Sequence, residues 1–526
     1  MRAEELTPHA VARMAATAPD RIAVEQAGGP RTTYGELHTA ALRWAHALEL
    51  AGARAGDRIA TMLPTSIEAF TVQLAVACLG GTAVALNTLW RGTMLARALS
   101  VTHCTVLVTT EDHRAEVAAL DLAAVGPRAI VLVDAVAGVD HGGTSVPVLL
   151  ADELLAGAEP SPRRGPVPEG IQGVIFTSGT SGPSKPVQLS HEFFLTCARR
   201  LIPGGADASG GAYYSPWPMG HSLGSLALAA AVDRGVRLVL RAGFSPDSFW
   251  PDVREFDCRT VVLVTVAQAL GQRPFRADDA DNPLRYVTMA PLIQDYRGFA
   301  ERFDVEVSGM YGMTEIGPAL TCSMPADHRV AGRPADGYEC RVADQAGAEQ
   351  PDGTPGELLV RAANQRALMS GYAGMAAESA RAFTDGWFHT GDLFVRQPTG
   401  DYYFLDRLKD SIRRRGRNIS SFEIEAEAAT HPSVLQCAAV GVPADLASDT
   451  PRADEEVKIF VVPRPGSELT PHELAEFLGA RLPRYMVPRY VEFAESLPTG
   501  TTHRPVKAVL RTLPNTRATF DRQAKI

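Results

Sequence analysis

Short apolar runs alternate with longer helix-like stretches through most of the chain. Between about residue 30 and residue 360, the pattern predicts helices at Tyr34–Leu50 and Ile67–Leu79. Apolar runs in the same region predict strands, among them Arg58–Met62, Val106–Val108, Ala129–Val133 and Val261–Val264. Because helices and strands in alternation are typical of wound α/β layers, we expect a large, multi-layer α/β domain.

The last part of the chain has a different pattern of charged and apolar stretches. A charged stretch covers Asp406–Arg417, and a helix is predicted at Ser421–Thr430. Apolar runs at Ala438–Val440 and Val457–Val462 predict two strands. The pattern indicates a separate and smaller α+β domain.

Composition limits the class of protein. A length of 526 residues suggests roughly two to four domains. Hydrophobic residues at 45% and charged residues at 21% are ordinary for a soluble globular protein. The formal charge of -9 argues against a general nucleic-acid binder, so no nucleic-acid partner is expected. The basic run Arg413–Arg415 is either a local phosphate site or, more commonly for such runs, a solvated face.

Cysteine usage and the N-terminus indicate a compartment. The seven cysteines are scattered and contain no Cys-x-x-Cys pair, which favours reduced, buried thiols over disulfides or zinc. The first residues lack the layout of a signal peptide, and no apolar run reaches the ~20 residues that cross a bilayer. We therefore expect a cytoplasmic protein without a membrane span.

A run of hydroxyls, glycines and one lysine directly follows the apolar run Gly173–Phe176. It contains Thr177, Ser178, Gly179, Thr180, Ser181, Gly182 and, after Pro183 and Ser184, Lys185. Glycines let backbone N–H groups converge, hydroxyls add donors and lysine adds a positive charge, which together suit a polyphosphate. The alternative is a flexible surface loop. Since Pro186 follows Lys185, the run does not fit the Walker pattern.

Five further segments stand at spaced positions: Tyr311–Glu315, Gly356–Arg361, Trp387–Asp392, Asp406–Asp410 and Gly416–Glu425. In this order, and together with the Thr177–Lys185 loop, they make the chain resemble the superfamily of adenylate-forming enzymes. This superfamily includes acyl-CoA synthetases, adenylation domains of peptide synthetases and firefly luciferase. The resemblance extends over nearly the whole chain and is greatest to acyl-CoA synthetases.

The resemblance implies a two-step reaction that uses ATP, Mg²⁺ and CoA. A carboxylate attacks the α-phosphate of ATP to give an acyl-adenylate and pyrophosphate, and a thiol then displaces AMP. Tyr311 would face adenine, Thr314 would bond the α-phosphate, and Glu315 would bind Mg²⁺. Asp392 would accept from the ribose hydroxyls, and Arg407 would reach the ribose or a phosphate. Thr180 would join the catalytic set, and Gly312 the nucleotide site.

Each of these residues also has an ordinary structural interpretation. Tyr311 could be a core aromatic residue, Asp392 a turn or cap residue, and Arg407 half of a surface ion pair. The ordered set of segments makes these alternatives improbable together.

The resemblance also implies domain boundaries. Residues 1–405 would bind ATP and the acid, 406–410 would form a solvated hinge, and 411–526 would form a small mobile domain. Lys409 matches the pivot of the hinge. Arg415 and Gly416 match a loop that lines the pantetheine channel in acyl-CoA synthetases.

This sequence differs from the family pattern at the lysine that stabilises charge during adenylation. Aligning Leu497–Pro498 and Lys507–Arg511 without gaps places His503-Arg504 where the family usually has Gly-Lys, and Lys507 matches a second family lysine. Arginine keeps the charge but is planar and forked. Three interpretations stay open: Arg504 substitutes, Lys507 reaches in instead, or the chain performs one half-reaction.

The acyl substrate is expected to be hydrophobic. Adenylation domains for α-amino acids hold the ammonium with an acidic residue, and no acid occurs from Ala208 to Val232. The resemblance places His221 beside the reacting carboxyl. The expected acid pocket contains Trp217, Met219, Gly309, Met310, Met313 and Gly317. Several of these side chains could instead pack the core.

These observations together predict an AMP-forming acyl-CoA synthetase for a hydrophobic carboxylic acid. One alternative is an enzyme that passes its acyl group to a carrier protein or performs one half-reaction with a partner enzyme. Another is a nucleotide-binding protein without turnover. A homodimer is an open possibility.

Overall fold

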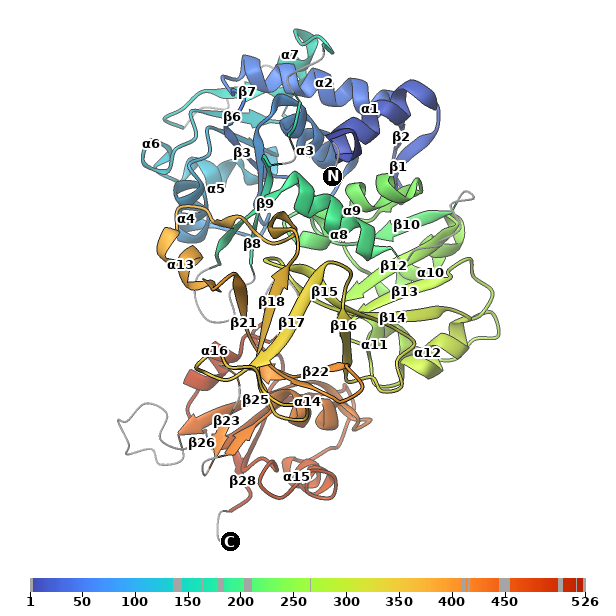
Figure 1. Cartoon of the computed structure of the whole chain (residues 1–526), viewed down its shortest axis with the longest axis vertical. Coiled ribbons are helices and arrows are strands. Elements are labelled where there is room, and N and C mark those ends of the chain that lie inside the picture. Colours follow the sequence, from blue (N-terminus) through green and yellow to red (C-terminus); the bar gives the residue numbers. More distant parts are fainter. Residues whose placement is uncertain are drawn as a thin grey trace. The chain divides into compact units, whose positions relative to one another are not determined.

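The computed structural model describes residues 3–135, 144–161, 165–167, 169–177, 184–202, 211–264, 266–408, 410, 412–414, 417–443, 455–499, 505–516 and 518–523. The chain forms two compact units (Figure 1). Unit 1 comprises Met1–Thr177, Lys185–Glu339 and Val360–Phe388, and unit 2 comprises Ser178–Ser184, Cys340–Leu359 and His389–Ile526. The predicted α/β class, with a large N-terminal part and a smaller C-terminal part, is confirmed. The exact limits predicted at residues 405 and 411 stay predictions.

The first sheet of unit 1 has the strand order β19-β9-β8-β4-β3-β5-β6-β7. All neighbours from β8 to β7 are parallel, whereas β9 is antiparallel to both β8 and β19. The strands are β3 (Arg58–Met62), β4 (Thr82–Ala85), β5 (Val106–Thr109), β6 (Ala129–Leu132), β7 (Val148–Leu150), β8 (Ile171–Phe176), β9 (Pro186–Ser190) and β19 (Gly371–Tyr372). The antiparallel β8–β9 hairpin carries the hydroxyl-rich loop at its tip.

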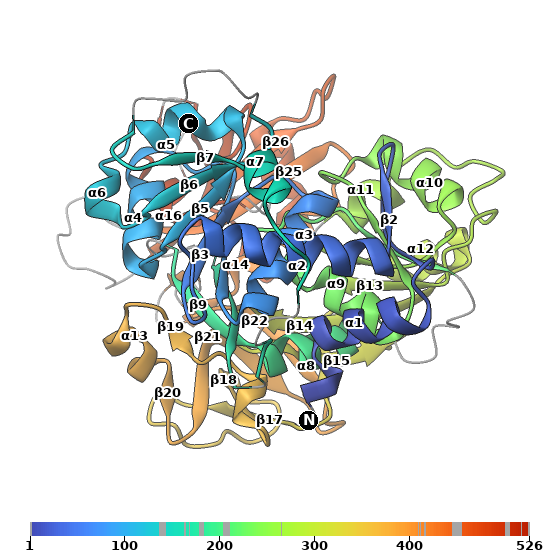
Figure 2. The same ribbon diagram turned by 90° about the horizontal axis from the view of Figure 1, so that it is seen from above.

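Helices cover this sheet. Leucines of α4 (Gly92–Thr102) and α6 (Leu122–Val125) pack with the buried side chains of β3, β5 and β6. Helices α2 (Tyr34–Leu50) and α3 (Ile67–Leu79) pack against each other, as Figure 2 shows. The predicted bounds of α2, α3 and β3 are confirmed. These bounds could be predicted because each element carries a strong apolar pattern and a capping residue or turn at its ends.

The second sheet of unit 1 runs β16-β15-β14-β13-β12-β10-β11-β1-β2. Strands from β14 to β1 are parallel to their neighbours, and the edges are antiparallel. The strands are β1 (Ile22–Gln26), β2 (Arg31–Thr33), β10 (Ala212–Ser215), β11 (Arg237–Leu240), β12 (Cys258–Val264), β13 (Tyr286–Ala290), β14 (Glu306–Met313), β15 (Gly317–Ser323) and β16 (Val330–Pro334). Aromatic side chains of α10 (Pro246–Glu255) and α12 (Tyr296–Phe303) fill one face of it.

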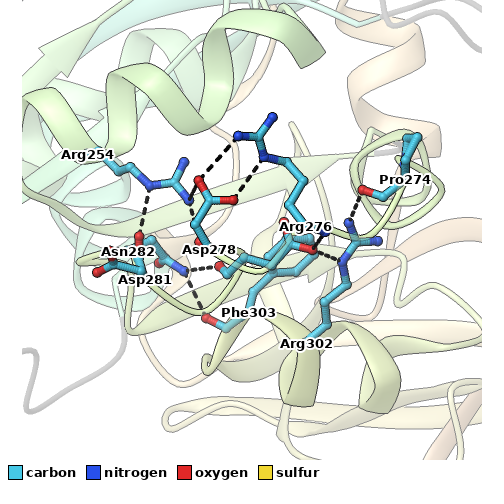
Figure 3. Close-up of polar contacts among 9 residues, drawn as sticks. Arg254, Pro274, Arg276, Asp278, Asp281, Asn282, Arg302 and Phe303 are labelled. Atoms are coloured by element: carbon cyan, nitrogen blue, oxygen red, sulfur yellow. Dashed lines mark hydrogen bonds and ion pairs between the residues drawn. The ribbon is translucent and has the colours of Figure 1, made fainter.

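A buried arginine fixes the loop between α11 (Ala267–Gly271) and β13 (Figure 3). Arg302 Nε donates to Asp279 Oδ2 at 2.7 Å, and the arginine side chain is only 6% exposed. The same guanidinium donates to the carbonyl oxygens of Gly271 (3.0 Å), Arg273 (2.9 Å) and Pro274 (2.9 Å). One side chain thus satisfies three backbone acceptors of the loop and one carboxylate.

Unit 2 contains a four-stranded sheet with the order β25-β26-β27-β28. Its strands are β25 (Val434–Pro443), β26 (Glu455–Pro463), β27 (Tyr490–Phe493) and β28 (Phe520–Asp521). Helices α14 (Ser421–Ala429) and α15 (Pro471–Gly479) bury apolar side chains against one set of strand residues. Helix α16 (Lys507–Thr512) buries Leu510 against the alternate set. The predicted helix at Ser421 and the two predicted strands are confirmed.

Most residues of four further strands also belong to unit 2. The strands β17 (Tyr338–Ala343), β18 (Gly356–Ala362), β21 (Trp387–Arg396) and β22 (Tyr402–Arg407) follow one another in that order. The short hairpin of β23 (Ile412–Arg414) and β24 (Arg417–Ile419) follows β22 in sequence. The end of β22 is therefore the connection to the C-terminal sheet.

The expectation of reduced, buried cysteines is confirmed for the thiol state and only in part for burial. All seven carry free thiols, but Cys322, Cys340 and Cys437 are only half-buried. Burial raises the pKa of the Cys104 thiol to about 11. In the part of the chain that the structure describes, no helix is both long and apolar enough to cross a membrane.

Candidate nucleotide and acid site

The β8–β9 hairpin closes the base of the hydroxyl-rich loop. The Thr177 N–H donates to the Lys185 carbonyl at 3.0 Å, and the Lys185 N–H donates to Thr177 Oγ1 at 3.2 Å. Lys185 thus lies where the strand register of Phe176 with Pro186 ends. Ser178, Gly179, Thr180, Ser181 and Gly182 lie outside the described residues. The two ends of the expected phosphate loop are fixed in unit 1.

The β14–β15 hairpin turns through Thr314, Glu315 and Ile316. Tyr311 lies near the end of β14, opposite Leu320 of β15. The Glu315 side chain is 5% exposed, and its carbonyl oxygen accepts from the Met369 N–H at 2.7 Å. A carboxylate so buried needs polar partners, because an isolated buried charge is costly. The turn therefore holds a buried carboxyl side chain beside the half-buried Thr314.

Sequence reasoning missed one residue at this site, Tyr372 of β19. Its hydroxyl donates to Glu315 Oε1 at 3.1 Å, and the Lys185 Nζ lies 4.9 Å from the centroid of its ring. Burial and the neighbouring Glu315 raise the pKa of Tyr372 well above its ordinary value. The contacts join Lys185 and Glu315, two predicted site residues that are 130 positions apart.

Glycines make the hairpin possible. A Cβ at Gly312 would lie 2.3 Å from the Gly317 carbonyl oxygen, where the register of the hairpin shifts. Gly317 has a φ of +63°, and a Cβ there would lie 2.4 Å from Cys197 Sγ. A Cβ at Gly309 would crowd Cys322 Sγ at 2.8 Å. The structure therefore gives these three glycines a local packing reason, beside the role in the acid pocket or nucleotide site that the sequence predicted.

The expected acid-binding segment precedes α9 (Ser222–Arg234). His221 caps this helix, with Nδ1 accepting from the Leu223 N–H at 3.3 Å, so that in the neutral ring the proton lies on Nε2. Trp217 Nε1 donates to the Val262 carbonyl at 2.8 Å, and the Trp217 and His221 ring centroids are 6.3 Å apart. Met219 is buried, and its N–H donates to Thr65 Oγ1 at 3.2 Å. Trp217 and His221 are half-buried.

Met310 and Met313 occupy β14 with half-buried side chains. Met310 stands opposite Thr321 of β15, and Met313 stands opposite Gly317. Both methionines belong to unit 1, as do the residues of the segment before α9. A role in an acid pocket stays a prediction for all of them.

A second group of predicted residues lies in unit 2. Asp392 of β21 is paired in register with Arg407 of β22, and Arg407 Nε lies 3.1 Å from Asp392 Oδ1. The Asp392 side chain is buried, whereas the Arg407 side chain is partly exposed. Glu357 contacts the two residues of β21 that flank Thr390. Its Oε1 accepts from the Gly391 N–H and its Oε2 lies against His389 Nδ1, both at 2.9 Å. Both oxygens of the Glu357 carboxylate therefore have a partner in β21.

The expected hinge differs from a solvated linker. Asp406 and Asp410, on either side of the predicted pivot, are buried. Asp406 Oδ2 accepts from the Ser421 N–H at 2.6 Å and from the Ser421 hydroxyl at 2.7 Å, and Arg511 Nη2 donates to Asp410 Oδ1 at 2.7 Å. The expectation of a solvated segment was wrong for these two carboxylates. Each has partners within unit 2 that compensate for burial.

Lys507 is held inside unit 2. Its Nζ lies 2.7 Å from Glu425 Oε1 and donates to Ser421 Oγ at 2.5 Å. Burial opposes its charge, but Glu425 and Asp406 outweigh burial and raise its pKa. Lys409, Arg415, Gly416 and Arg504 lie outside the described residues.

The described residues contain no group of three or more His, Cys, Asp and Glu side chains arranged to hold a metal ion. A magnesium ion in a nucleotide site needs only one or two carboxylates, since phosphate oxygens and water complete its shell. Glu315 supplies such a hard oxygen donor, oriented by Tyr372. The residues present therefore fit an Mg²⁺ ion that arrives with ATP.

Lys185 at the end of the hydroxyl-rich loop and the oriented Glu315 carboxyl are in keeping with the resemblance to adenylate-forming enzymes. A family profile described as AMP-binding enzyme matches residues 11–373, and one described as AMP-binding enzyme C-terminal domain matches residues 423–504. The chain belongs to this family, and the resemblance to adenylate-forming enzymes is confirmed.

One curated relative spans nearly the whole chain, and another spans about two thirds of it. A feruloyl-CoA synthase from an Amycolatopsis species is 31% identical over 511 residues, which cover 95% of this chain and 97% of that protein. A crotonobetaine/carnitine–CoA ligase from Proteus mirabilis is 29% identical over 348 residues, covering 64% and 66%. The crystal structure of ATP-bound MatB from Rhodopseudomonas palustris matches with a TM-score of 0.82 and 26% identity, covering 96% and 98%.

Proposed function

We propose that this chain is an AMP-forming acid–CoA ligase that activates a hydrophobic, preferably aromatic, carboxylic acid. One observation carries the proposal: Tyr372 contacts both Lys185, at the base of the phosphate loop, and Glu315, in the β14–β15 turn. A fixed cation and a fixed hard anion in one place suit a nucleotide triphosphate with its metal ion. Family membership and relatives named as CoA synthases or ligases support the same activity.

The chemistry proceeds in two displacements. A carboxylate oxygen of the acid attacks the α-phosphorus of ATP, and the bond to the β-phosphate oxygen breaks, which yields acyl-AMP and pyrophosphate. The thiolate of CoA then attacks the acyl carbon, and AMP leaves with the electron pair of the acyl–oxygen bond. Mg²⁺, when bound at Glu315, neutralises phosphate charge during the first displacement. Lys185 would bind phosphate oxygens, and Thr314 would donate to the α-phosphate.

The predicted site residues of unit 2 would bind the nucleotide and assist the transfer of the acyl group to CoA. Asp392, which is paired with Arg407, would accept from both ribose hydroxyls. Arg407 would reach the ribose or a phosphate. Since the Lys507 ammonium is committed to Glu425, Arg504 is the better candidate for the charge that stabilises adenylation. Arg415 and Gly416 would line the path of the pantetheine thiol, and Lys409 would be the pivot.

The acid is proposed to be aromatic. Trp217 and His221 present two rings and Met219 a buried thioether within one short segment. The segment contains no carboxylate that would hold an ammonium group. Ferulate, the acid in the name of one relative, is therefore the first substrate to test.

The test supplies the chain with ATP and Mg²⁺ and with ferulate, benzoate, octanoate, crotonobetaine or phenylalanine in turn. Each reaction runs with CoA, with a carrier protein or with neither, and acyl-AMP and thioester are quantified separately by mass spectrometry. Formation of feruloyl-CoA and AMP, with little product from phenylalanine, is the expected result. Conversion of synthetic acyl-AMP to acyl-CoA provides a separate assay of the second step.

Each other outcome rejects part of the proposal. Thioester on the carrier protein but not on CoA would replace CoA as the acceptor. Acyl-AMP without thioester, or conversion of synthetic acyl-AMP alone, would identify a half-reaction enzyme. Binding of ATP without release of pyrophosphate from any acid would identify a nucleotide-binding protein without turnover.

A further inference from the structure

We infer that Tyr372 is a positioning residue that sets the places of Lys185 and Glu315 at the same time, and that its hydroxyl acts on metal binding while its ring acts on nucleotide binding. The inference rests on the proposed function, since it assigns a role within the same site. No part of the sequence pattern assigned a role to Tyr372, because it lies in a two-residue strand outside every motif segment.

The backbone around Tyr372 ties together the two halves of the site. The Met369 N–H donates to the Glu315 carbonyl at 2.7 Å, on the side of the β14–β15 turn. The Ala373 N–H donates to the Pro186 carbonyl at 2.8 Å, next to Lys185. Segment 369–373 therefore fixes the distance between the turn that carries Glu315 and the strand that begins after Lys185.

The side chain uses two different surfaces. Its hydroxyl, a donor at 3.1 Å from Glu315 Oε1, restricts the rotation of that carboxylate. Its ring attracts the Lys185 ammonium, 4.9 Å from the centroid, through the negative charge of the π face. Since Tyr372 is 6% exposed, both contacts are shielded from water on at least part of their surface.

The arrangement holds two opposite charges at different surfaces of one residue. An ammonium and a carboxylate attract each other, and a direct pair would neutralise both groups. Here the ammonium lies over the ring face, and the carboxylate is bonded at the hydroxyl edge. Removal of the hydroxyl and removal of the ring should therefore have separable effects.

The test compares Tyr372→Phe, which removes only the hydroxyl, with Tyr372→Leu, which also removes the ring. Mn²⁺ replaces Mg²⁺, and its dissociation constant in the presence of a non-hydrolysable ATP analogue is measured from the electron paramagnetic resonance of free Mn²⁺. The affinity for the metal-free analogue is measured separately by isothermal titration calorimetry. Both are binding readouts that need no turnover.

Tyr372→Phe is expected to weaken Mn²⁺ binding about tenfold, as for loss of one hydrogen bond to a charged group, with metal-free nucleotide affinity within about twofold of wild type. Tyr372→Leu is expected to weaken both affinities. The matched control is Tyr214→Phe, which removes a buried hydroxyl from another carboxylate of unit 1, Asp252, outside the site. It should change neither affinity.

Two results would overturn the inference: equal weakening of metal and metal-free nucleotide by Tyr372→Phe, or no change in either. Should Tyr372→Leu fail to fold, the isosteric Tyr372→Phe still decides the role of the hydroxyl. Failure of the wild-type chain to bind the analogue at all would count against the proposed function instead, because the inference concerns only differences between variants.

Discussion

His191 is the first residue of α8 (His191–Leu201), and its imidazole is buried. Burial, with a smaller contribution from His9, lowers the pKa of His191 to about 4. The unfolded chain, with an ordinary histidine pKa of about 6.5, binds this proton more readily than the folded chain. Stability from the neutral imidazole is therefore complete above pH 6.5, and it is lost as the pH falls toward 4.

We predict that His191→Gln flattens the dependence of unfolding free energy on pH between 6.5 and 4. The wild-type chain should lose about 3 kcal/mol more than the variant across this window, because the pKa of His191 is about 4 in the folded chain and about 6.5 in the unfolded chain. Urea unfolding at a series of pH values measures the effect. His472→Gln, which alters a histidine exposed at the surface, is the control and should leave the slope unchanged. Parallel slopes for wild type and His191→Gln would contradict the prediction.

At the scale of the element, Arg302 holds a loop that has no regular structure of its own. We predict that Arg302→Met lowers the free energy of unfolding by about 3–5 kcal/mol, because Asp279 and three carbonyls would lose their buried partner. Tryptophan fluorescence during urea unfolding measures the loss. Arg276→Met is the matched control, since Arg276 pairs with Asp278 at the surface of the same loop (Figure 3).

The control should show almost no change, because exposed ion pairs contribute little. A loss of stability in Arg276→Met as large as that in Arg302→Met would mean that the loop depends on its surface charges. The buried arginine would then have no special role in fixing β13.

The junction of β22, α14 and α16 makes a second prediction at this scale. Lys507→Met should lower the stability of unit 2 by about 3–5 kcal/mol, because Glu425 and Asp406 would stay buried without a cation. The double variant Lys507→Met with Glu425→Leu should regain part of the loss. Hydrogen exchange of α14 and α16 measures both effects.

The same variants separate a structural from a chemical role of Lys507. Arg504→Met is expected to reduce acyl-AMP formation with little change in hydrogen exchange. If Lys507→Met instead reduces acyl-AMP formation while exchange in α14 and α16 stays as in wild type, Lys507 acts on the reaction itself. The interpretation that Lys507 replaces the family lysine would then be favoured.

At the scale of the whole molecule, each unit contains its own hydrophobic clusters. All five tryptophans lie in unit 1: Trp44, Trp90, Trp217, Trp250 and Trp387. Fluorescence therefore reports on unit 1, whereas far-ultraviolet circular dichroism reports on both units. We predict that the two signals do not coincide during urea unfolding, since chains with separate cores depart from two-state behaviour.

Coincident transitions would show that the units unfold together. The Lys507→Met variant provides an internal check, because a change confined to unit 2 should shift the circular dichroism transition and leave the fluorescence transition in place. Arg302→Met, a change in unit 1, should shift the fluorescence transition together with the unit 1 part of the circular dichroism transition.

The sequence by itself determined the elements, the family and much of the candidate site. Helices α2 and α3 and strand β3 could be located to the residue because local apolar pattern and capping act over a few positions. Lys185 could be named as a candidate because a lysine beside glycines and hydroxyls suits a polyphosphate, whereas Glu315 and Asp392 could be named from the resemblance to adenylate-forming enzymes. Their roles stay predictions.

Only the tertiary structure decided which of these groups meet, and through which partners. Tyr372 stands 57 positions from Glu315 and 187 from Lys185, and strand pairing of β19 with β9 brings it to both. Burial of Asp406 and Asp410 likewise depends on α14 and α16, which follow them in the chain. Long-range pairing and the burial of charge depend on the whole packed chain, so no local pattern could reveal them.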